Sequence, residues 1–128
     1  MFDQEKFATV INCMDGRVQR PVNEWIKKNY AVQYVDTITE PGPNKILAIN
    51  DDSASLKSIR NRINISVLKH GSRLIAIAGH HDCAGNPSDK ETQTQHILTA
   101  IDMVKSWKYD ATIIGLWIDE KWIVHEVK

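Results

Sequence analysis

Both cysteines and one of the five histidines in this 128-residue sequence follow short apolar segments, and their side chains can bind transition metals. Cys13 follows the apolar segment 7–12, and His80 and Cys83 follow a second apolar segment, 74–78. We expect both segments to be buried parallel strands, and if these are neighbours the three side chains meet at the carboxyl edge of the sheet. Two thiolates and one imidazole suit Zn²⁺, and three protein ligands leave one tetrahedral position open, as catalytic zinc sites do. The alternative is that the cysteines are small buried hydrophobic residues and His80 belongs to a turn.

A carboxylate and a guanidinium follow the first cysteine at alternate positions, as Asp15 and Arg17. In an extended turn such side chains project to the same side as the Cys13 thiol. A bidentate ion pair would hold Asp15 ionised, ready to accept a hydrogen bond from a group on the metal. The alternative is a surface ion pair that contributes less than about 1 kcal/mol.

Strands and helices must alternate to bring these side chains together. Short β-branched or apolar runs predict strands at 7–12, 32–38, 74–78 and 111–117, and apolar spacings of three and four predict helices between them. The helices are expected at 21–29, at 53–69 after Asp51 and Asp52, and from Ser88 to about 107, where Ser88 and Glu91 would form a capping box. Residues 39–44 are expected to continue neither a helix nor a strand. Residues 122–127 predict a last, antiparallel edge strand.

This order predicts an α/β fold in one domain, 1–128. It is a three-layer α/β/α arrangement with a mostly parallel sheet of about four strands plus the C-terminal antiparallel edge strand. Sixteen basic residues balance sixteen acidic ones, which argues against a nucleic-acid or membrane-surface partner. No apolar run is long enough to span a membrane and no secretory signal is visible, so we expect a cytoplasmic protein with reduced cysteines.

The two motifs, Cys-x-Asp-x-Arg after one buried strand and Gly-His-x-x-Cys after a later one, resemble those of the β-class carbonic anhydrases. The resemblance extends along the whole chain, from Arg17-Val18 and Pro21 to the final Gly115–Asp119 segment. It implies a zinc lyase that hydrates carbon dioxide reversibly to bicarbonate through a zinc-bound hydroxide. Cys13, His80 and Cys83 would be the metal ligands, and Asp15 and Arg17 the catalytic dyad. Gln4 would reach the substrate across the interface of a homodimer or higher homo-oligomer.

The sequence departs from the family pattern at two places near this site. Thr39-Glu40-Pro41-Gly42 stands where typical members have an Arg-Asn-Ala-Gly-like stretch, and Ala84 replaces the first glycine of Cys-Gly-Gly. Two other functions therefore stay open: hydrolysis of carbonyl sulfide or carbon disulfide at the same site, and a non-catalytic zinc-binding assembly module. The sequence also leaves open whether water or Asp15 takes the fourth zinc position.

Overall fold

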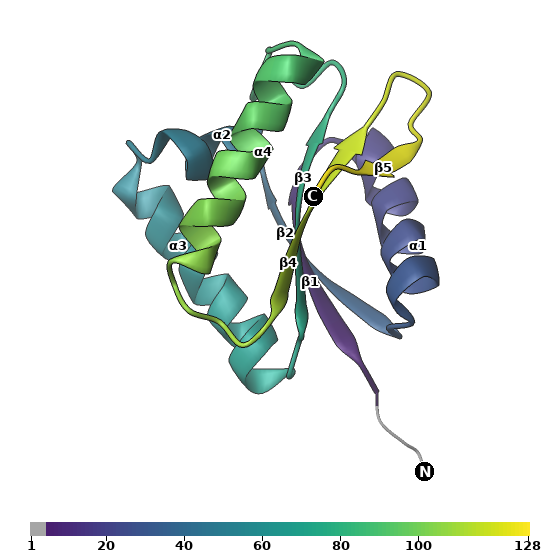
Figure 1. The fold of residues 1–128 in the computed structure, drawn as a ribbon, viewed down its shortest axis with the longest axis vertical. Coiled ribbons are helices and arrows are strands. Elements are labelled where there is room, and N and C mark those ends of the chain that lie inside the picture. Colours follow the sequence, from purple (N-terminus) through teal and green to yellow (C-terminus); the bar gives the residue numbers. More distant parts are fainter. Residues whose placement is uncertain (1–4) are drawn as a thin grey trace.

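Strands and helices alternate along the chain in the computed structural model, which describes residues 5–128 (Figure 1). The strands are β1 (Phe7–Cys13), β2 (Tyr34–Glu40), β3 (Leu74–His80), β4 (Thr112–Ile118) and β5 (Val124–Glu126). The helices are α1 (Gln19–Tyr30), α2 (Pro43–Ile49), α3 (Ser53–Asn64) and α4 (Lys90–Lys105). A 3-10 turn over Gly16–Val18 precedes α1, and a π-helical segment over Ile65–Lys69 extends α3.

The five strands form one sheet in the order β2-β1-β3-β4-β5. All pairs are parallel except β4 with the edge strand β5, which is antiparallel. The predicted α/β class and the antiparallel last strand are therefore confirmed. Because the chain leaves β1 toward β2 on one side and later returns as β3 on the other, the strand order reverses between β1 and β3. Open α/β sheets bind ligands at the carboxyl end of such a switch point.

Helices cover both faces of the sheet, α1 on one and α2, α3 and α4 on the other (Figure 1). Strand β3 shows why, since every one of its side chains is buried. Ala76 and Ala78 pack with Ile26 of α1, whereas Ile75 and Ile77 pack with Ile101 of α4 and its neighbours. A strand that is apolar on both faces needs a helix layer on each side.

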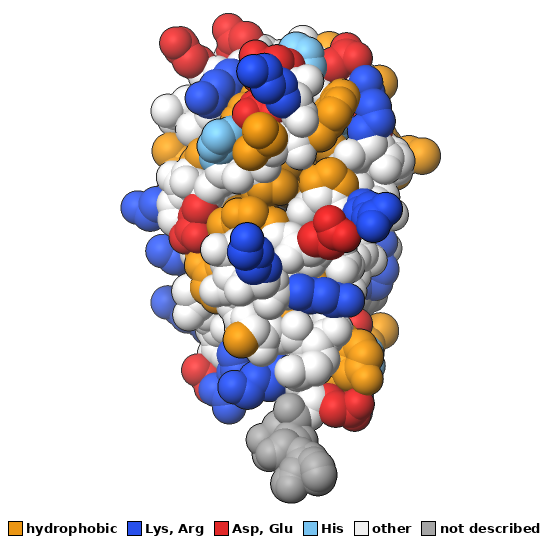
Figure 2. Space-filling view, turned by 90° about the vertical axis from the view of Figure 1, so that its right-hand side faces the viewer, with side chains coloured by type: hydrophobic (Ala, Val, Ile, Leu, Met, Phe, Trp, Pro, Cys, Tyr) orange, Lys and Arg blue, Asp and Glu red, His pale blue; other side chains and the backbone are white. Residues whose placement is uncertain are grey.

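A single helix, α1, covers the side that also carries β5. Trp25, Tyr30, Trp122 and Val124 pack against that core while remaining partly exposed. Figure 2 looks onto this side and shows hydrophobic side chains between the charged ones. Among residues 5–128, no helix has the length and apolar character that crossing a bilayer requires.

Two local predictions are wrong. Residues 39–44 were expected to be irregular, but Thr39 and Glu40 end β2 and Pro43 opens α2. Only two residues separate these elements, because Gly42 adopts a left-handed conformation (φ +61°) and the proline at the first helical position needs no hydrogen-bond acceptor.

The Ser88–Glu91 capping box does not form. Helix α4 begins at Lys90, where the carboxylate of Asp89 accepts a hydrogen bond from the Thr92 amide. The Ser88 hydroxyl instead donates to the side-chain oxygen of Asn86. Either residue suits an N-cap, and the fold selects Asp89 because Ser88 is engaged in the preceding loop.

Candidate active site

Cys13, His80 and Cys83 converge at the carboxyl end of the sheet. Cys13 ends β1, His80 ends β3 and Cys83 lies in the loop after β3, so the β1–β3 pairing brings them together. Their ligand atoms all lie within 4.8 Å of one another, and all three residues are buried. Among residues 5–128, no further Cys, His, Asp or Glu side chain joins this group.

The geometry of the three side chains fits a zinc ion. The two sulfurs lie 3.8 Å apart, and two thiolates on a tetrahedral zinc with bonds of 2.3 Å would be separated by about 3.8 Å. Nδ1 of His80 lies 2.7 Å from the His81 carbonyl oxygen, which only accepts, so this nitrogen donates. Nε2 then carries the lone pair, and it is buried with no hydrogen-bond partner in the described chain. A buried unpaired nitrogen of this kind is expected of a metal ligand.

Electrostatics at the two sulfurs favour one thiolate before a metal binds. The hydrogen bond from Cys83 lowers the pKa of the Cys13 thiol to about 4, with help from the backbone at Gly42 and Asp15. The same contact, together with burial, raises the pKa of Cys83 well above its usual value. Burial opposes protonation of the His80 ring, but its contacts with Cys13 and the His81 carbonyl outweigh this and raise its pKa. Protons therefore compete with a cation for this site as the pH falls.

Asp15 and Arg17 form the bidentate pair that the sequence predicts. Nε and Nη2 of Arg17 donate to the two carboxylate oxygens of Asp15 at 3.1 and 2.7 Å. The Arg17 amide donates to the same carboxylate at 2.9 Å, so three hydrogen bonds hold it. The hydrogen bonds and charge of Arg17 lower the pKa of Asp15 to about 2. Asp15 is therefore an ionised, oriented acceptor beside the Cys13–His80–Cys83 group.

A buried amide network supports the strand end that carries His80, and sequence reasoning missed it. The Gln93 side chain donates to the His80 carbonyl at 2.8 Å and accepts from the His80 amide at 3.2 Å. It also donates to the Asn86 carbonyl at 3.1 Å and accepts from the Asn44 amide. The side chains of Asn44, Asn86 and Gln93 are all buried. Gln93 thus ties β3 to the loop that carries Cys83.

Two glycines next to the departures from the family pattern contact each other through their backbones. Gly42 and Gly85 pack backbone to backbone, and a Cβ on Gly85 would lie 2.3 Å from the carbonyl carbon of Pro41. This contact requires glycine at both positions. The Glu40 carboxylate forms an ion pair with Arg62 of α3. The charge of Glu40, at the end of β2, is therefore balanced by a helix that lies outside the site.

A cavity of about 620 Å³ opens beside the dyad and the Cys83 loop. It is lined by Asp15, Arg17, His81, Asp82, Cys83, Ala84, Pro87, Ser88, Asp89 and Lys90. Water and a small uncharged molecule have room here next to Cys83 and the ion pair. Gln4, the sequence candidate for substrate contact, lies outside the described residues.

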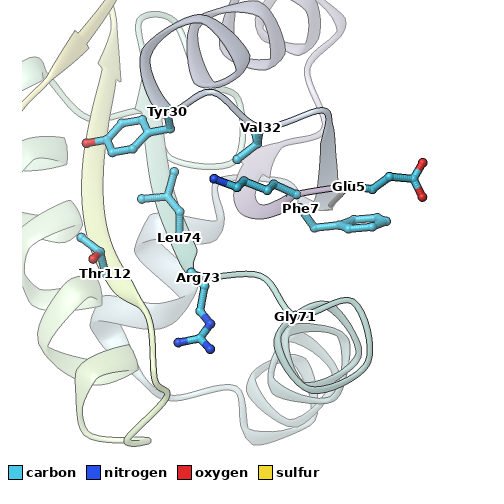
Figure 3. A pocket seen from close by; sticks show the side chains of 9 residues that line it. Glu5, Phe7, Tyr30, Val32, Gly71, Arg73, Leu74 and Thr112 are labelled. Atoms are coloured by element: carbon cyan, nitrogen blue, oxygen red, sulfur yellow. The ribbon is translucent and has the colours of Figure 1, made fainter. Parts of the chain in front are cut away.

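A second cavity, of about 350 Å³, lies at the opposite, amino end of the strands. Figure 3 shows Leu74, Val32 and Tyr30 in its wall, with the charged ends of Glu5 and Arg73 pointing in different directions. Arg73 is paired with Asp110, and Glu5 accepts a hydrogen bond from the Tyr34 hydroxyl. These two charged groups are therefore engaged by other side chains, and Lys6 is the third charged residue in the lining.

Comparisons with known proteins agree with this geometry. Residues 3–128 match a family model described as "Putative carbonic anhydrase". No match is found among curated proteins. A tetrameric β-carbonic anhydrase of the fungus Sordaria macrospora superposes with a TM-score of 0.62 at 12% identity, over 98% of this chain and 82% of that one. The β-carbonic anhydrase CafA of Aspergillus fumigatus gives a TM-score of 0.52 at 14% identity, over 98% and 76%. At these identities the two structures establish a shared fold.

Proposed function

Because the chain belongs to a carbonic anhydrase family, we propose that it hydrates carbon dioxide reversibly to bicarbonate with a zinc ion. Cys13, His80 and Cys83 would hold the metal, and Asp15 and Arg17 would form the catalytic dyad. The observation that carries the proposal is the buried, unpaired Nε2 of His80 beside two sulfurs spaced as on a tetrahedral zinc.

Zinc held by these ligands supplies a Lewis acid that lowers the pKa of water toward neutrality. Two thiolates reduce its net charge, so we expect a weaker effect than with three histidines. Asp15 would accept a hydrogen bond from the attacking water and so direct an oxygen lone pair at the carbon of the substrate. With a pKa of about 2, the Asp15 carboxylate acts as an orienting acceptor and is too weak a base to hold the product proton at neutral pH.

Arg17 has a separate task, which is to hold Asp15 in place. Because the guanidinium occupies both carboxylate oxygens, rotation of Asp15 toward the metal ligands would cost two charge-assisted hydrogen bonds. We propose that this keeps the fourth metal position free for water rather than for Asp15. The cavity beside the dyad provides the path by which carbon dioxide enters and bicarbonate leaves.

The proposal is tested by measuring zinc per chain together with stopped-flow hydration of carbon dioxide. We expect one zinc per chain and hydration well above the buffer rate. The matched control is Asp15→Asn, which keeps the size of the side chain and removes its charge. It should retain the metal and lose most of the hydration rate.

Two other outcomes would reject carbon dioxide as the substrate. Zinc with no hydration, but with release of hydrogen sulfide from carbonyl sulfide or carbon disulfide, would identify a hydrolase for those molecules. Zinc with neither activity would identify a metal-binding assembly module. A chain that binds no zinc under reducing conditions would contradict the whole proposal.

We also propose that the protein assembles as a homodimer or a higher homo-oligomer. Strand β2 is an edge of the sheet, and its backbone groups on the outer side are available for pairing. The Sordaria macrospora relative in fold is tetrameric. Sedimentation equilibrium over a range of concentrations would measure the oligomeric state, and a monomer at all concentrations would contradict this proposal.

Replacing Gln4 with Ala in the same protein would test whether that residue affects the KM for carbon dioxide.

A further inference from the structure

The Arg17 guanidinium is held by three different loops at the carboxyl end of the sheet. Its own loop supplies Asp15. The loop after β3 supplies Asp82, whose carboxylate lies 3.3 Å from Nη1 and whose carbonyl oxygen lies 3.2 Å from Nη2. The turn between β4 and β5 supplies Trp122, and the centroid of its ring lies 4.4 Å from the Cζ atom of Arg17. The edge of the guanidinium is therefore hydrogen-bonded and one of its faces is covered.

Trp122 lies in a conformation that a tryptophan rarely adopts. Its φ is +62°, in the left-handed region that costs a side-chain-bearing residue free energy. Asp119 imposes this turn: its carboxylate accepts hydrogen bonds from the Lys121 and Ile123 amides at 2.8 and 3.0 Å. The same carboxylate bonds the ring of His125 in β5 at 2.7 Å. A turn held this firmly presents the indole at a fixed place.

Asp82 has the same unusual backbone conformation, with φ +57°. Two non-glycine residues in the left-handed region thus both contact Arg17, and they come from separate loops. Strained backbone of this kind persists where the surrounding structure holds it, and it often marks functional sites. A planar guanidinium on an indole face is also a favourable cation–π contact.

We infer that Trp122 is a positioning residue for the reaction, acting through Arg17 on the orientation of Asp15. This inference rests on the proposed function, since it assigns a task within the same dyad. Nearly half of the Arg17 side chain is exposed, so without the indole the guanidinium could tilt toward solvent. The Asp15 carboxylate would follow it, and the attacking water would lose its fixed acceptor.

The kinetic test compares Trp122→Leu with Trp122→Phe. We expect Trp122→Leu to lower kcat about tenfold with little change in KM, because substrate affinity is not altered. Trp122→Phe keeps an aromatic face and should restore most of the rate. Trp107→Leu is the matched control, because Trp107 makes the same kind of contact with Arg60, at 5.1 Å, on the other side of the sheet. That variant should keep the wild-type kcat.

A second measurement separates action through Arg17 from other roles. In an Arg17→Lys background, which loses the bidentate pair, Trp122→Leu should cause no further loss of kcat. If the loss of kcat in the double variant is the product of the losses in the two single variants, the inference is overturned. The ring centroids of Trp122 and His80 lie 6.3 Å apart. Because His80 is a proposed zinc ligand, the zinc affinity of Trp122→Leu must be measured as well. A weaker zinc affinity in Trp122→Leu would assign the effect to His80 instead and equally overturn the inference.

A readout that does not need activity distinguishes failure of this inference from failure of the proposed function. The Nε–H signal of Arg17 in a ¹H–¹⁵N spectrum, identified by its loss in Arg17→Lys, should be shielded by the indole ring and protected from exchange by Asp15. In Trp122→Leu this signal should move downfield and the Nε–H proton should exchange faster. If the leucine variant does not fold, Trp122→Met makes the same comparison. An unchanged signal would overturn the inference even in an active enzyme. A changed signal in a protein without hydration activity would instead refute the proposed function alone.

Discussion

The two ends of the sheet each have a cavity, and within residues 5–128 the cluster of metal-capable side chains lies at the carboxyl end. At that end three metal-capable side chains are buried, with 4%, 1% and 4% of Cys13, His80 and Cys83 exposed. At the amino end Arg73 is exposed and pairs with Asp110 at 2.8 Å, and the exposed Lys6 also lines the cavity. Leu74 and Val32 lie in the lining of the amino-end cavity (Figure 3).

This difference shows that a cavity alone does not identify a functional site. What distinguishes the carboxyl end is a buried polar atom that the described chain leaves unsatisfied, Nε2 of His80. Leaving such an atom without a partner costs about 1–3 kcal/mol, which a bound ligand can recover. The parallel topology explains the asymmetry, because loops after β1 and β3 meet at the carboxyl edge and can bring side chains from distant parts of the chain together.

Replacing a proposed metal ligand should have the largest effect on the carboxyl end. Cys83→Ser keeps the size of the side chain but lacks a thiolate, so we expect zinc to be lost and hydration to fall to background. Metal content by mass spectrometry and stopped-flow rates would measure this. Ala84→Gly, at the next position, should keep both properties. Retention of stoichiometric zinc in Cys83→Ser would show that the three side chains do not act as one site.

Removing the guanidinium should have the next largest effect. Arg17→Ala frees Asp15 to rotate, and we expect kcat to fall about 100-fold while zinc remains bound. Stopped-flow kinetics would measure the change. Arg20→Ala is the control, since Arg20 is an exposed partner of Glu24 in α1. A near-normal rate in Arg17→Ala would refute the role of the dyad.

The buried amide network should matter for metal affinity rather than for the reaction step. Gln93→Leu removes the donors and the acceptor that hold the His80 backbone and the Asn86 carbonyl. We expect zinc affinity to weaken about 10- to 100-fold, as measured by competition with a chelator. Gln95→Leu, on an exposed position of the same helix, should leave the affinity unchanged. Equal affinities in the two variants would mean that Gln93 only fills space.

The ion pair of the dyad should also affect acid stability of the metal-free protein. The pKa of Asp15 is lowered from 3.8 to about 2 by Arg17. Its contribution to the free energy of unfolding is therefore present above about pH 4 and is lost as the pH falls through 2. Arg17→Ala should lower the free energy of unfolding at pH 6 and flatten its decline below pH 4. Urea unfolding at a series of pH values would show whether the two proteins converge in acid.

The smallest effect is expected at the amino end. Arg73→Ala breaks an exposed ion pair, so the free energy of unfolding should fall by less than about 1 kcal/mol. Hydration and zinc affinity should stay at wild-type values, as measured by the same assays. A clear loss of either property would show that the two ends of the sheet are coupled.

Much of this architecture follows from the order of the residues. The apolar runs of β1 and β3, the alternation with helices and the antiparallel last strand are all predictable, because burial on two faces requires continuous apolar strands. The pairing of Asp15 with Arg17 is predictable as well, since two residues in a tight turn have few other arrangements. Local signals were ambiguous where two residues suited one task, as with Ser88 and Asp89 at the start of α4.

The tertiary structure alone decided what depends on contacts between distant segments. Gln93 is separated from His80 by thirteen positions and Trp122 from Arg17 by more than a hundred, and neither has a spacing that marks it beforehand. The close approach of Gly42 to Gly85 is of the same kind. Residue types and spacing determine which groups are chemically able to act, because that is a property of each side chain. Which of these groups are fixed in position depends on whether loops from distant parts of the chain meet. The packing of the helix layers on the sheet determines where those loops lie.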